Sequence, residues 1–374
     1  MSRPEEINCL AAGLCSGCSW IEKKIDLQKD LKMRALQEGL ATLFPRTTSE
    51  FPEIRYERPF EKGFRDRLDF IFENGRRGLY SVSTKKIYDL PSCPLLSPAL
   101  AELYEDFRKV DFPIQKGSFR LRSGPQGQRG MWLDFSNKDI KFLLEEQLTL
   151  KKLLDLGFVE IGQKGKRLVS TESRLKLHAP VFQKWFNSRF QKVPVPLYSL
   201  VSHFTQPGHA MNQVLLSLIE DMFQDKAFDL AVEFGSGIGN LTFTFLSFCK
   251  NIIALDWSGS ALQALRETVA EYPTIKNRIQ VREGNFIKQP LLFGEICPDL
   301  LILNPARSGV GQFLNHLPEN NNKPTHLFYM SCYLESFLKD ALVIKQKKYT
   351  LKGALIFDQF PHSPHFEILS LWTI

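Results

Sequence analysis

From about residue 200 onward, apolar segments of strand length alternate with segments of helical periodicity. The apolar segments span residues 228–234, 251–257, 299–304 and 326–331, and helical patterns fill 258–271 and about 334–346. Strands that are joined through helices run parallel in one sheet. The alternation therefore predicts a doubly wound α/β fold, which binds its ligands at the carboxyl ends of the strands. Two further β-like segments, 349–360 and 365–374, close the chain.

The first part of the chain has a different pattern. Short β-rich segments alternate with basic turns, and two helical patterns interrupt them at 21–43 and about 96–109. This predicts an α+β domain with an antiparallel sheet. Two prolines in residues 192–200 mark the boundary, so we expect one domain over 1–200 and another over 201–374. An alternative placement packs the helix at 21–43 on the second domain.

Charge is distributed unevenly between these two parts. The 374 residues carry a net charge of +7. Residues 1–200 contain 34 lysines and arginines against 25 acidic residues, whereas residues 201–374 contain 14 against 16. We therefore expect the first domain, and not the second, to meet a polyanion.

Composition excludes several classes of protein. Hydrophobic residues make up 43% and charged residues 24%, as in globular proteins, which excludes wholesale disorder. No run approaches the roughly 18 apolar residues of a membrane span, and the N-terminal residues lack the layout of a signal peptide. Seven cysteines are too few for a disulfide framework. We expect a cytoplasmic protein that does not enter a membrane.

A glycine-rich turn follows the first strand of the α/β pattern. It reads Glu233-Phe-Gly235-Ser-Gly237-Ile-Gly239, and the next strand ends in Asp256, 21 residues after Gly235. A carboxylate at that position can bind ribose hydroxyls, so the pattern predicts a nucleoside-containing cofactor. Glu233 would repel a pyrophosphate but could hold an ammonium group. This favours S-adenosylmethionine (SAM) over NAD as the cofactor.

Two reactive side chains are expected near the ends of later strands. Cys332 stands where the strand at 326–331 gives way to a helix, and a helix N-terminus stabilises a thiolate. Glu367 follows a turn rich in proline, histidine and phenylalanine, where desolvation would make it a general base. Asn304-Pro-Ala-Arg307 closes another strand at the same expected edge. A core cysteine is the alternative reading of Cys332.

Four cysteines in the first domain form a separate set. Cys9, Cys15 and Cys18 have the spacing C-x5-C-x2-C, and Cys93 precedes a proline. Structural zinc sites more often contain two C-x2-C pairs, and four thiolates can also bind an iron–sulfur cluster. The spacing alone leaves iron–sulfur and zinc as alternatives. Cys249 and Cys297 are expected to be structural, the former in a helix.

Basic residues are concentrated in two segments of the first domain. We expect them to bind phosphates as a set, although most single ones would only face solvent. Phe182, Trp185 and Phe186 lie among them and could stack on a base, with a core role as the favoured alternative. The two groups are Lys164, Lys166, Arg167, Arg174, Lys176, Lys184, Arg189 and Lys192, and Arg65, Arg67, Arg76, Arg77, Lys85 and Lys86.

Taken together, the ordered motifs resemble the RNA uracil-5-methyltransferase family over nearly the whole chain. The matching segments are Phe204-Thr-Gln206 with Asn212-Gln213, the glycine turn, Asn304-Pro-Ala-Arg307, Ser331-Cys332, and Phe360-Pro-His362-Ser-Pro-His365-Phe-Glu367. The resemblance implies a Rossmann-like SAM-dependent methyltransferase domain after an RNA-binding domain. It implies that Cys332 adds to C6 of uracil and that Glu367 later removes the C5 proton.

The resemblance also implies the remaining site residues. The SAM-contacting positions of the family correspond to Gln206, Gly235, Asp256 and Asn304, with Asn285 as an addition. Arg307 would steady the site or bind phosphate. One branch of the family carries a [4Fe–4S] cluster on cysteines with the spacing of Cys9, Cys15, Cys18 and Cys93, which favours iron–sulfur over zinc here.

Within the family, the chain is most similar to the branch that methylates a hairpin uridine of 23S ribosomal RNA. Cys9 leaves no room for the N-terminal barrel of other branches, and Asn304 is usual in this one. Gly208 and Tyr333 depart from the family's usual asparagines. The alternatives are transfer RNA as the substrate, or an RNA-binding protein that has lost catalysis. We expect a monomer without a protein partner.

Overall fold

The computed structural model describes residues 7–45, 51–134, 138–171, 174–284, 296–318 and 323–374. The chain divides into two compact units that combine segments distant in sequence. The first unit consists of Met1–Lys23, Phe60–Asn187 and Tyr198–Asn212, and the second of Lys24–Pro59, Ser188–Leu197 and Gln213–Ile374. Residues 24–59 therefore pack with the second half of the chain. The division into domains 1–200 and 201–374 stays a prediction.

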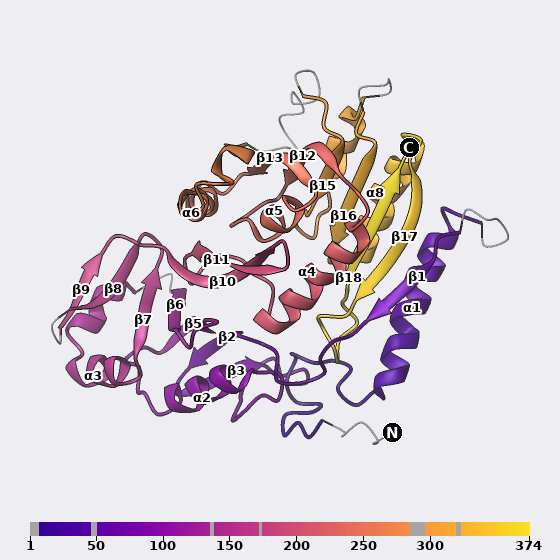
Figure 1. The fold of residues 1–374 in the computed structure, drawn as a ribbon. Helices are drawn as coiled ribbons and strands as arrows, with labels where there is room; N and C mark the ends of the chain where they lie inside the picture. Colours follow the sequence, from indigo (N-terminus) through magenta and orange to yellow (C-terminus); the bar gives the residue numbers. More distant parts are fainter. Residues whose placement is uncertain (1–6, 46–50, 135–137, 172–173, 285–295, 319–322) are drawn as a thin grey trace. The chain divides into compact units, whose positions relative to one another are not determined.

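The second unit is built on an eight-stranded sheet (Figure 1). Its strands are β1 (Ile54–Glu57), β12 (Phe228–Phe234), β13 (Cys249–Asp256), β14 (Ile279–Glu283), β15 (Leu300–Leu303), β16 (His326–Ser331), β17 (Thr350–Phe357) and β18 (Glu367–Thr373). They lie in the order β1-β17-β18-β16-β15-β12-β13-β14. Strand β18 runs antiparallel to both neighbours, and the other pairs are parallel. The predicted α/β fold is confirmed.

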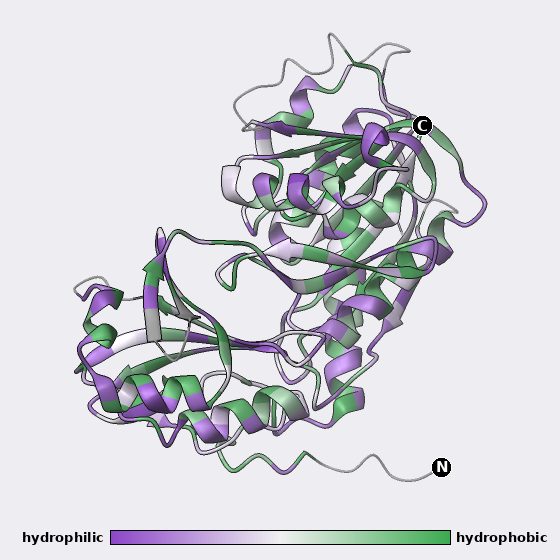
Figure 2. Cartoon of the chain, turned by 60° about the vertical axis from the view of Figure 1, so that its left-hand side comes forward, coloured by the Kyte–Doolittle hydropathy of each residue, from purple (hydrophilic) through white to green (hydrophobic). Residues whose placement is uncertain are grey.

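Helices cover both faces of this sheet, because alternate strand residues point to opposite sides. In β16, Tyr329 belongs to a core cluster that includes Leu36 of α1 and Phe337 of α8. The next residue towards the N-terminus, Phe328, contacts Phe223 of α4. Figure 2 shows hydrophobic residues concentrated on these central strands. The helices of this unit are α1 (Ile25–Ala41), α4 (His209–Phe223), which begins in the first unit, α5 (Asn240–Phe245), α6 (Gly259–Ala270) and α8 (Leu334–Gln346), with 3-10 turns η2 (Lys276–Arg278) and η3 (Gly311–His316).

Helix α1 packs on α8 although the two are far apart in sequence. Its side chains Leu36 and Leu40 are completely buried in the core cluster of the second unit. A Cβ atom added to Gly39 would lie only 2.6 Å from Cδ1 of Leu338 in α8. The small residue therefore permits a close helix–helix contact.

The first unit contains its own eight-stranded sheet, in the order β4-β3-β2-β5-β6-β7-β8-β9. All of its pairs are antiparallel except β6 with β7. Helix α2 packs on this sheet through Phe107, whose ring contacts Phe70 and Phe119 at centroid distances of 5.8 and 5.5 Å. The predicted α+β fold with a mainly antiparallel sheet is confirmed.

The elements of the first unit, together with a hairpin that continues into the second, have the following bounds. The strands are β2 (Arg67–Glu73), β3 (Arg76–Tyr80), β4 (Ile87–Asp89), β5 (Lys116–Ser123), β6 (Arg129–Asp134), β7 (Phe158–Gln163), β8 (Lys166–Thr171) and β9 (Arg174–His178), and the hairpin is β10 (Gln183–Phe190) with β11 (Val193–Ser199). The helices are α2 (Pro98–Phe107), η1 (Ile140–Leu144) and α3 (Gln147–Asp155).

Three details refine the sequence-based expectations. Cys249 begins strand β13, so its predicted position in a helix is wrong. A short apolar segment can belong to a buried strand or to a buried helix, and its local pattern does not distinguish the two. Trp185 and Phe186 are buried, which favours a core role over base stacking. Among the described residues, no helix has the length and apolar character needed to cross a membrane.

The packing of α1 can be tested by removing one buried side chain. Leu36→Ala should lower the free energy of unfolding by about 2–5 kcal/mol, because it leaves a cavity in the core beneath the helix. Leu27→Ala on the same helix is the control, since that side chain is 47% exposed, and it should cost less than about 0.5 kcal/mol. Urea titration measures both changes, and equal losses would contradict the packing described.

Candidate active site

One edge of the sheet in the second unit gathers five of the predicted site residues. Gly235, Asn304 and Cys332 directly follow the parallel strands β12, β15 and β16, and Asp256 ends β13. Strand β18 runs antiparallel beside β16, with Ser331 opposite Ile368, so its first residue, Glu367, lies at the same edge. The strand order reverses between β12 and β15, where doubly wound sheets bind ligands.

The turn after β12 requires glycine at position 235. Gly235 has a φ of 79°, a backbone conformation that residues other than glycine rarely adopt. A Cβ atom there would lie 2.3 Å from the carbonyl oxygen of Asn304, and Asn304 N–H donates to the carbonyl of Phe234 at 3.0 Å. The turns after β12 and β15 are therefore in direct contact, and they bring two predicted cofactor positions together.

Asp256 is fixed in orientation by the backbone around it. Its Oδ2 accepts a hydrogen bond from Gly237 N–H and its Oδ1 one from Ser258 N–H, each at 2.8 Å. An ionised carboxylate offers about four acceptor positions, so each oxygen keeps capacity for another donor. Two acceptor positions on one carboxylate match the two neighbouring hydroxyl groups of a ribose in number.

Glu233 is a completely buried carboxyl group beneath the glycine turn. Its Oε2 accepts a hydrogen bond from the Thr242 hydroxyl at 2.6 Å, while its Oε1 has no partner among the described residues. Burial raises the pKa of Glu233 to about 8, the hydrogen bond from Thr242 opposes this rise, and the charge of Asp256 adds to it. An unpaired buried oxygen of this kind fits a cationic ligand group, such as the ammonium of SAM.

Cys332 lies between the end of β16 and the first residue of α8, and it is partly buried. Burial raises the pKa of Cys332, and the charge of Glu367 raises it further, while Arg307 lowers it by charge and by a hydrogen bond. Burial and Glu367 therefore oppose the lowering that the sequence predicts from a helix N-terminus. Desolvation and a neighbouring carboxylate both disfavour the thiolate.

Glu367 is held by a glutamine that the sequence pattern did not identify. Gln359 Nε2 donates a hydrogen bond to Oε1 of Glu367 at 2.6 Å. Burial raises the pKa of Glu367 to about 7, against the opposing effects of this hydrogen bond and of Arg307. A general base works best when its pKa lies near the pH of the reaction. Gln359 follows the paired strand β17, so only the sheet pairing brings it to Glu367.

The other predicted positions are placed differently. Gln206 is buried in the first unit, and its Oε1 has no partner among the described residues. Asn285 lies outside the described residues. A Cβ atom on Gly208 would lie 1.8 Å from the carbonyl oxygen of Phe64, so this backbone excludes the asparagine of the family pattern. Tyr333 is the N-cap residue of α8 and makes no side-chain capping hydrogen bond.

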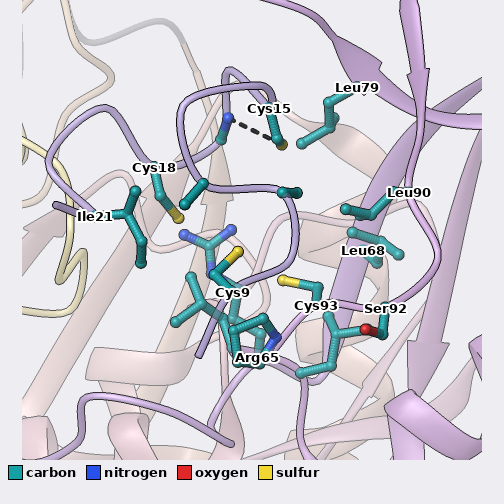
Figure 3. A pocket seen from close by; sticks show the side chains of 16 residues that line it. Cys9, Cys15, Cys18, Ile21, Arg65, Leu68, Leu79, Leu90, Ser92 and Cys93 are labelled. Atoms are coloured by element: carbon teal, nitrogen blue, oxygen red, sulfur yellow. Dashed lines mark hydrogen bonds between the residues drawn. The ribbon is translucent and has the colours of Figure 1, made fainter. Parts of the chain in front are cut away.

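Cys9, Cys15, Cys18 and Cys93 line a single pocket in the first unit (Figure 3). Apolar side chains that include Leu68, Leu79 and Leu90 surround them. The backbone N–H of Gly17 donates to Sγ of Cys15 at 3.3 Å. The remaining residues that line the pocket are Ala11, Ala12, Gly17, Ile21, Arg65, Ser92, Pro94, Leu95 and Leu96.

The guanidinium group of Arg65 lies among these sulfur atoms (Figure 3). Burial raises the pKa of Cys18 to about 12, and Arg65 opposes this rise by its charge. The Nε of Arg65 is buried and has no hydrogen-bond partner within the described part of the chain. Across that same part, no three or more His, Cys, Asp or Glu side chains are close enough together to hold a single metal ion. The four cysteine thiols thus share one pocket with the Arg65 cation. Among the described residues, the thiols do not converge closely enough to bind one metal ion.

Comparison with known proteins identifies the family. The family model of tRNA (uracil-5-)-methyltransferase matches residues 194–372. An uncharacterized RNA methyltransferase of Bdellovibrio bacteriovorus is 38% identical over 98% of this chain and 95% of its own length. The chain belongs to the RNA (uracil-5-)-methyltransferase family. Members of this family are SAM-dependent RNA methyltransferases.

Relatives with lower sequence identity to this chain are named for a specific RNA and uracil. A 23S rRNA (uracil(1939)-C(5))-methyltransferase of Haemophilus influenzae is 24% identical, over 98% of this chain and 82% of its own. A 23S rRNA (uracil(747)-C(5))-methyltransferase of Pasteurella multocida is 23% identical, over 96% and 97%. The crystal structure of a Pyrococcus abyssi tRNA (uracil-54, C5)-methyltransferase, in complex with S-adenosyl-L-homocysteine, has a TM-score of 0.65 at 19% identity, over 96% and 86%. This last likeness shows the fold.

The electrostatic coupling of Glu367 to Cys332 can be tested by alkylation. Above pH 7 Glu367 is largely ionised, and its charge disfavours the thiolate. Glu367→Gln removes that charge, so the pH at which half of Cys332 reacts as thiolate should fall. Iodoacetamide rates measured from pH 6 to 10, with mass spectrometry of the Cys332 peptide, report this midpoint. The exposed Glu267→Gln is the control, and an unchanged or higher midpoint in Glu367→Gln would contradict the coupling.

Proposed function

We propose that this chain methylates C5 of a uridine in ribosomal RNA, with SAM as the methyl donor, Cys332 as nucleophile and Glu367 as base. The observation that carries the proposal is the meeting of Cys332 and the buried Glu367 at the sheet edge that also carries the glycine turn. Neither residue alone is distinctive, but a thiol paired with a base matches what methylation of C5 requires.

The first step activates the pyrimidine, because C5 of uracil is a weak nucleophile. The sulfur of Cys332 forms a bond to C6, and the electrons of the C5–C6 double bond move towards C5 and the C4 carbonyl. Arg307, which hydrogen-bonds to Cys332 and lowers its pKa, stabilises the thiolate that attacks. SAM supplies an electrophilic methyl group, which C5 takes with release of S-adenosylhomocysteine.

The second step restores the double bond. Glu367 removes the proton from C5, the electrons of that bond reform the C5–C6 double bond, and Cys332 leaves as a thiolate. With a pKa of about 7, Glu367 is ionised in a large fraction of molecules near neutral pH and can accept this proton. Gln359 keeps one carboxylate oxygen occupied, which fixes the orientation of the other.

The glycine turn and its surroundings fit SAM as the donor. Glu233 would hold the ammonium group through its unpartnered Oε1, and Asp256 would accept both ribose hydroxyls. Gly235 and Asn304 would line the cofactor through backbone that a larger residue at 235 could not form. Gln206 and Asn285 are proposed as further contacts because of the family pattern alone.

The RNA substrate is proposed from the relatives and from charge. Among the relatives named for 23S rRNA, one is named for uracil 1939 and another for uracil 747, and their sequence identities to this chain are nearly equal, at 24% and 23%. Asn304, which is usual in the branch specific for the hairpin uridine, favours uracil 747. Basic residues of the first unit that remain exposed would bind phosphate, and they include Arg76, Lys85, Lys86, Lys164 and Lys176. Arg77 is buried against the Val110 carbonyl, which removes it from this set.

We also propose a [4Fe–4S] cluster on Cys9, Cys15, Cys18 and Cys93. All four line one pocket, and backbone N–H groups bond to the sulfurs of Cys15 and Cys93. A cluster takes one cysteine per iron, so its thiols surround a volume instead of converging on one ion. The positive charge of Arg65 would offset the negative charge of four thiolates. Methyl transfer moves no net electrons, so no catalytic step is assigned to the cluster.

The cluster has a direct chemical test. Protein purified without oxygen should be brown and contain iron and acid-labile sulfide, and Cys93→Ala should lose both because one iron loses its ligand. Cys297→Ala is the control, since Cys297 is exposed and lies outside the pocket. A colourless protein that contains zinc would contradict the iron–sulfur proposal.

Tritium release tests the proposed reaction. Unmodified 23S rRNA labelled with tritium at C5 of uracil should lose label only when SAM is present, and the turnover rate should rise with pH through about 7 as Glu367 ionises. Cys332→Ala should abolish release, because no adduct forms. Glu367→Gln should instead accumulate a methylated covalent adduct with RNA. No release from 23S rRNA or transfer RNA, with RNA still bound, would indicate the alternative of an RNA-binding protein without catalysis.

A further inference from the structure

The loop between β17 and β18 carries Gln359 and leads to Glu367, the first residue of β18. Helix α1 contacts this loop with two buried polar side chains. Gln28 of α1 is completely buried and bonds to His362 of the loop. His362 N–H donates to Oε1 of Gln28 at 2.8 Å, and Nε2 of Gln28 lies 3.3 Å from Nδ1 of His362. His362 has a φ of 64°, a left-handed conformation that is uncommon for residues other than glycine. The paired amide stabilises this unusual backbone.

A second contact from α1 lies one turn further along the helix. Lys32 Nζ donates to Oδ1 of Asp358 at 2.6 Å and to the carbonyl of Phe360 at 3.1 Å. Both charged side chains are 0% exposed. Tyr56 of β1 donates its hydroxyl proton to the other oxygen, Oδ2 of Asp358, at 2.6 Å. The start of the loop is thus held by three directional contacts from the segment 24–59.

The energetics of the buried Lys32–Asp358 pair indicate that it positions the loop more than it stabilises the fold. A buried ion pair must be removed from water, and this desolvation cost is of the same order as the attraction that it gains, so apolar residues would hold the helix equally well. Indeed the next two buried positions of the same helix stripe are apolar, Leu36 and Leu40. The two buried polar side chains of α1, Gln28 and Lys32, are the ones that contact the loop. Their directionality fixes where the loop runs.

The contacts form a continuous path to the carboxylate. Asp358, held by Lys32, directly precedes Gln359, and Gln359 donates to Glu367. His362, held by Gln28, lies between Gln359 and Glu367 in the same loop. A shift of the loop at either anchor would therefore move the amide that orients the carboxylate.

We propose that Gln28 and Lys32 are positioning residues for Glu367, so that helix α1 sets the geometry of proton removal at C5. This inference rests on the proposed function, because it takes Glu367 to be the base. It predicts that loss of either anchor slows the last step of the reaction while leaving adduct formation by Cys332 and the binding of both substrates intact.

The test compares two anchor variants with a matched surface variant. Gln28→Leu and Lys32→Met should lower kcat for tritium release by about 10–100-fold, because small misplacement of a reacting group costs rates of this order. The dissociation constants for SAM and RNA should stay within about twofold of the wild-type values, because the anchors act on a step that follows the binding of both substrates. Arg34→Met removes an exposed cation from the same helix and should match the wild type.

The covalent adduct separates positioning from general damage. If Glu367 is misplaced, methylated RNA should remain attached to Cys332 in both anchor variants on denaturing gels, as it does in Glu367→Gln. Lys32→Arg, which keeps the cation, should accumulate less adduct than Lys32→Met. Variants that are folded and turn over at the wild-type rate, or that lose turnover without any adduct, would overturn the proposal.

Hydrogen exchange gives a readout that needs no activity. Amides of residues 359–366 should exchange faster in Gln28→Leu than in the wild type, while those of α6 stay unchanged. If Lys32→Met does not fold, Tyr56→Phe replaces it, since it removes one hydrogen bond to Asp358 with little change in volume. If the loop exchanges faster in Gln28→Leu but the wild-type protein releases no tritium, the proposed function is refuted and the anchoring of the loop by α1 is not. If loop exchange is unchanged in Gln28→Leu, the anchoring of the loop by α1 is refuted.

Discussion

The arrangement of the site depends on one backbone constraint, the antiparallel insertion of β18 between β16 and β17. Parallel strands deliver only their final residues to the ligand-binding edge of a doubly wound sheet. Because β18 runs the other way, it delivers its first residue, Glu367, beside Cys332, which follows β16. The proposed base and the proposed nucleophile thereby meet at one edge of the sheet.

Burial then sets the chemistry of the groups at this edge. Glu233 and Glu367 have pKa values raised to about 8 and about 7, in both cases mainly by desolvation. Each has one oxygen engaged by a neighbouring side chain, Thr242 or Gln359. In the proposed function, Glu233 binds the cationic ammonium group and Glu367 takes a proton from carbon. Water-exposed carboxylates would be ionised regardless of the ligand.

The segment 24–59 is integral to this site although it precedes the first unit's sheet in sequence. Its strand β1 extends the sheet, and its helix α1 packs on α8, which follows Cys332, and on the loop that leads to Glu367. Gln28 and Lys32 continue the buried stripe of Leu36 and Leu40 at a spacing of four, but as polar residues they give no apolar signal of burial. Sequence reasoning could expect the helix, but the burial of its polar residues depends on what it packs against.

The sequence by itself determined the class of fold, the glycine turn with Asp256, the spacing of the cysteines and the identity of Cys332 and Glu367 as reactive candidates. These follow from local patterns, because strand and helix periodicity and turn chemistry act over a few residues. Only the tertiary structure decided which groups hold them: Gln359 on Glu367, Arg307 on Cys332, Arg65 among the four thiols and α1 on the loop. Such contacts join residues up to hundreds of positions apart, and desolvation in a packed interior, which no local pattern reports, gives them their effect.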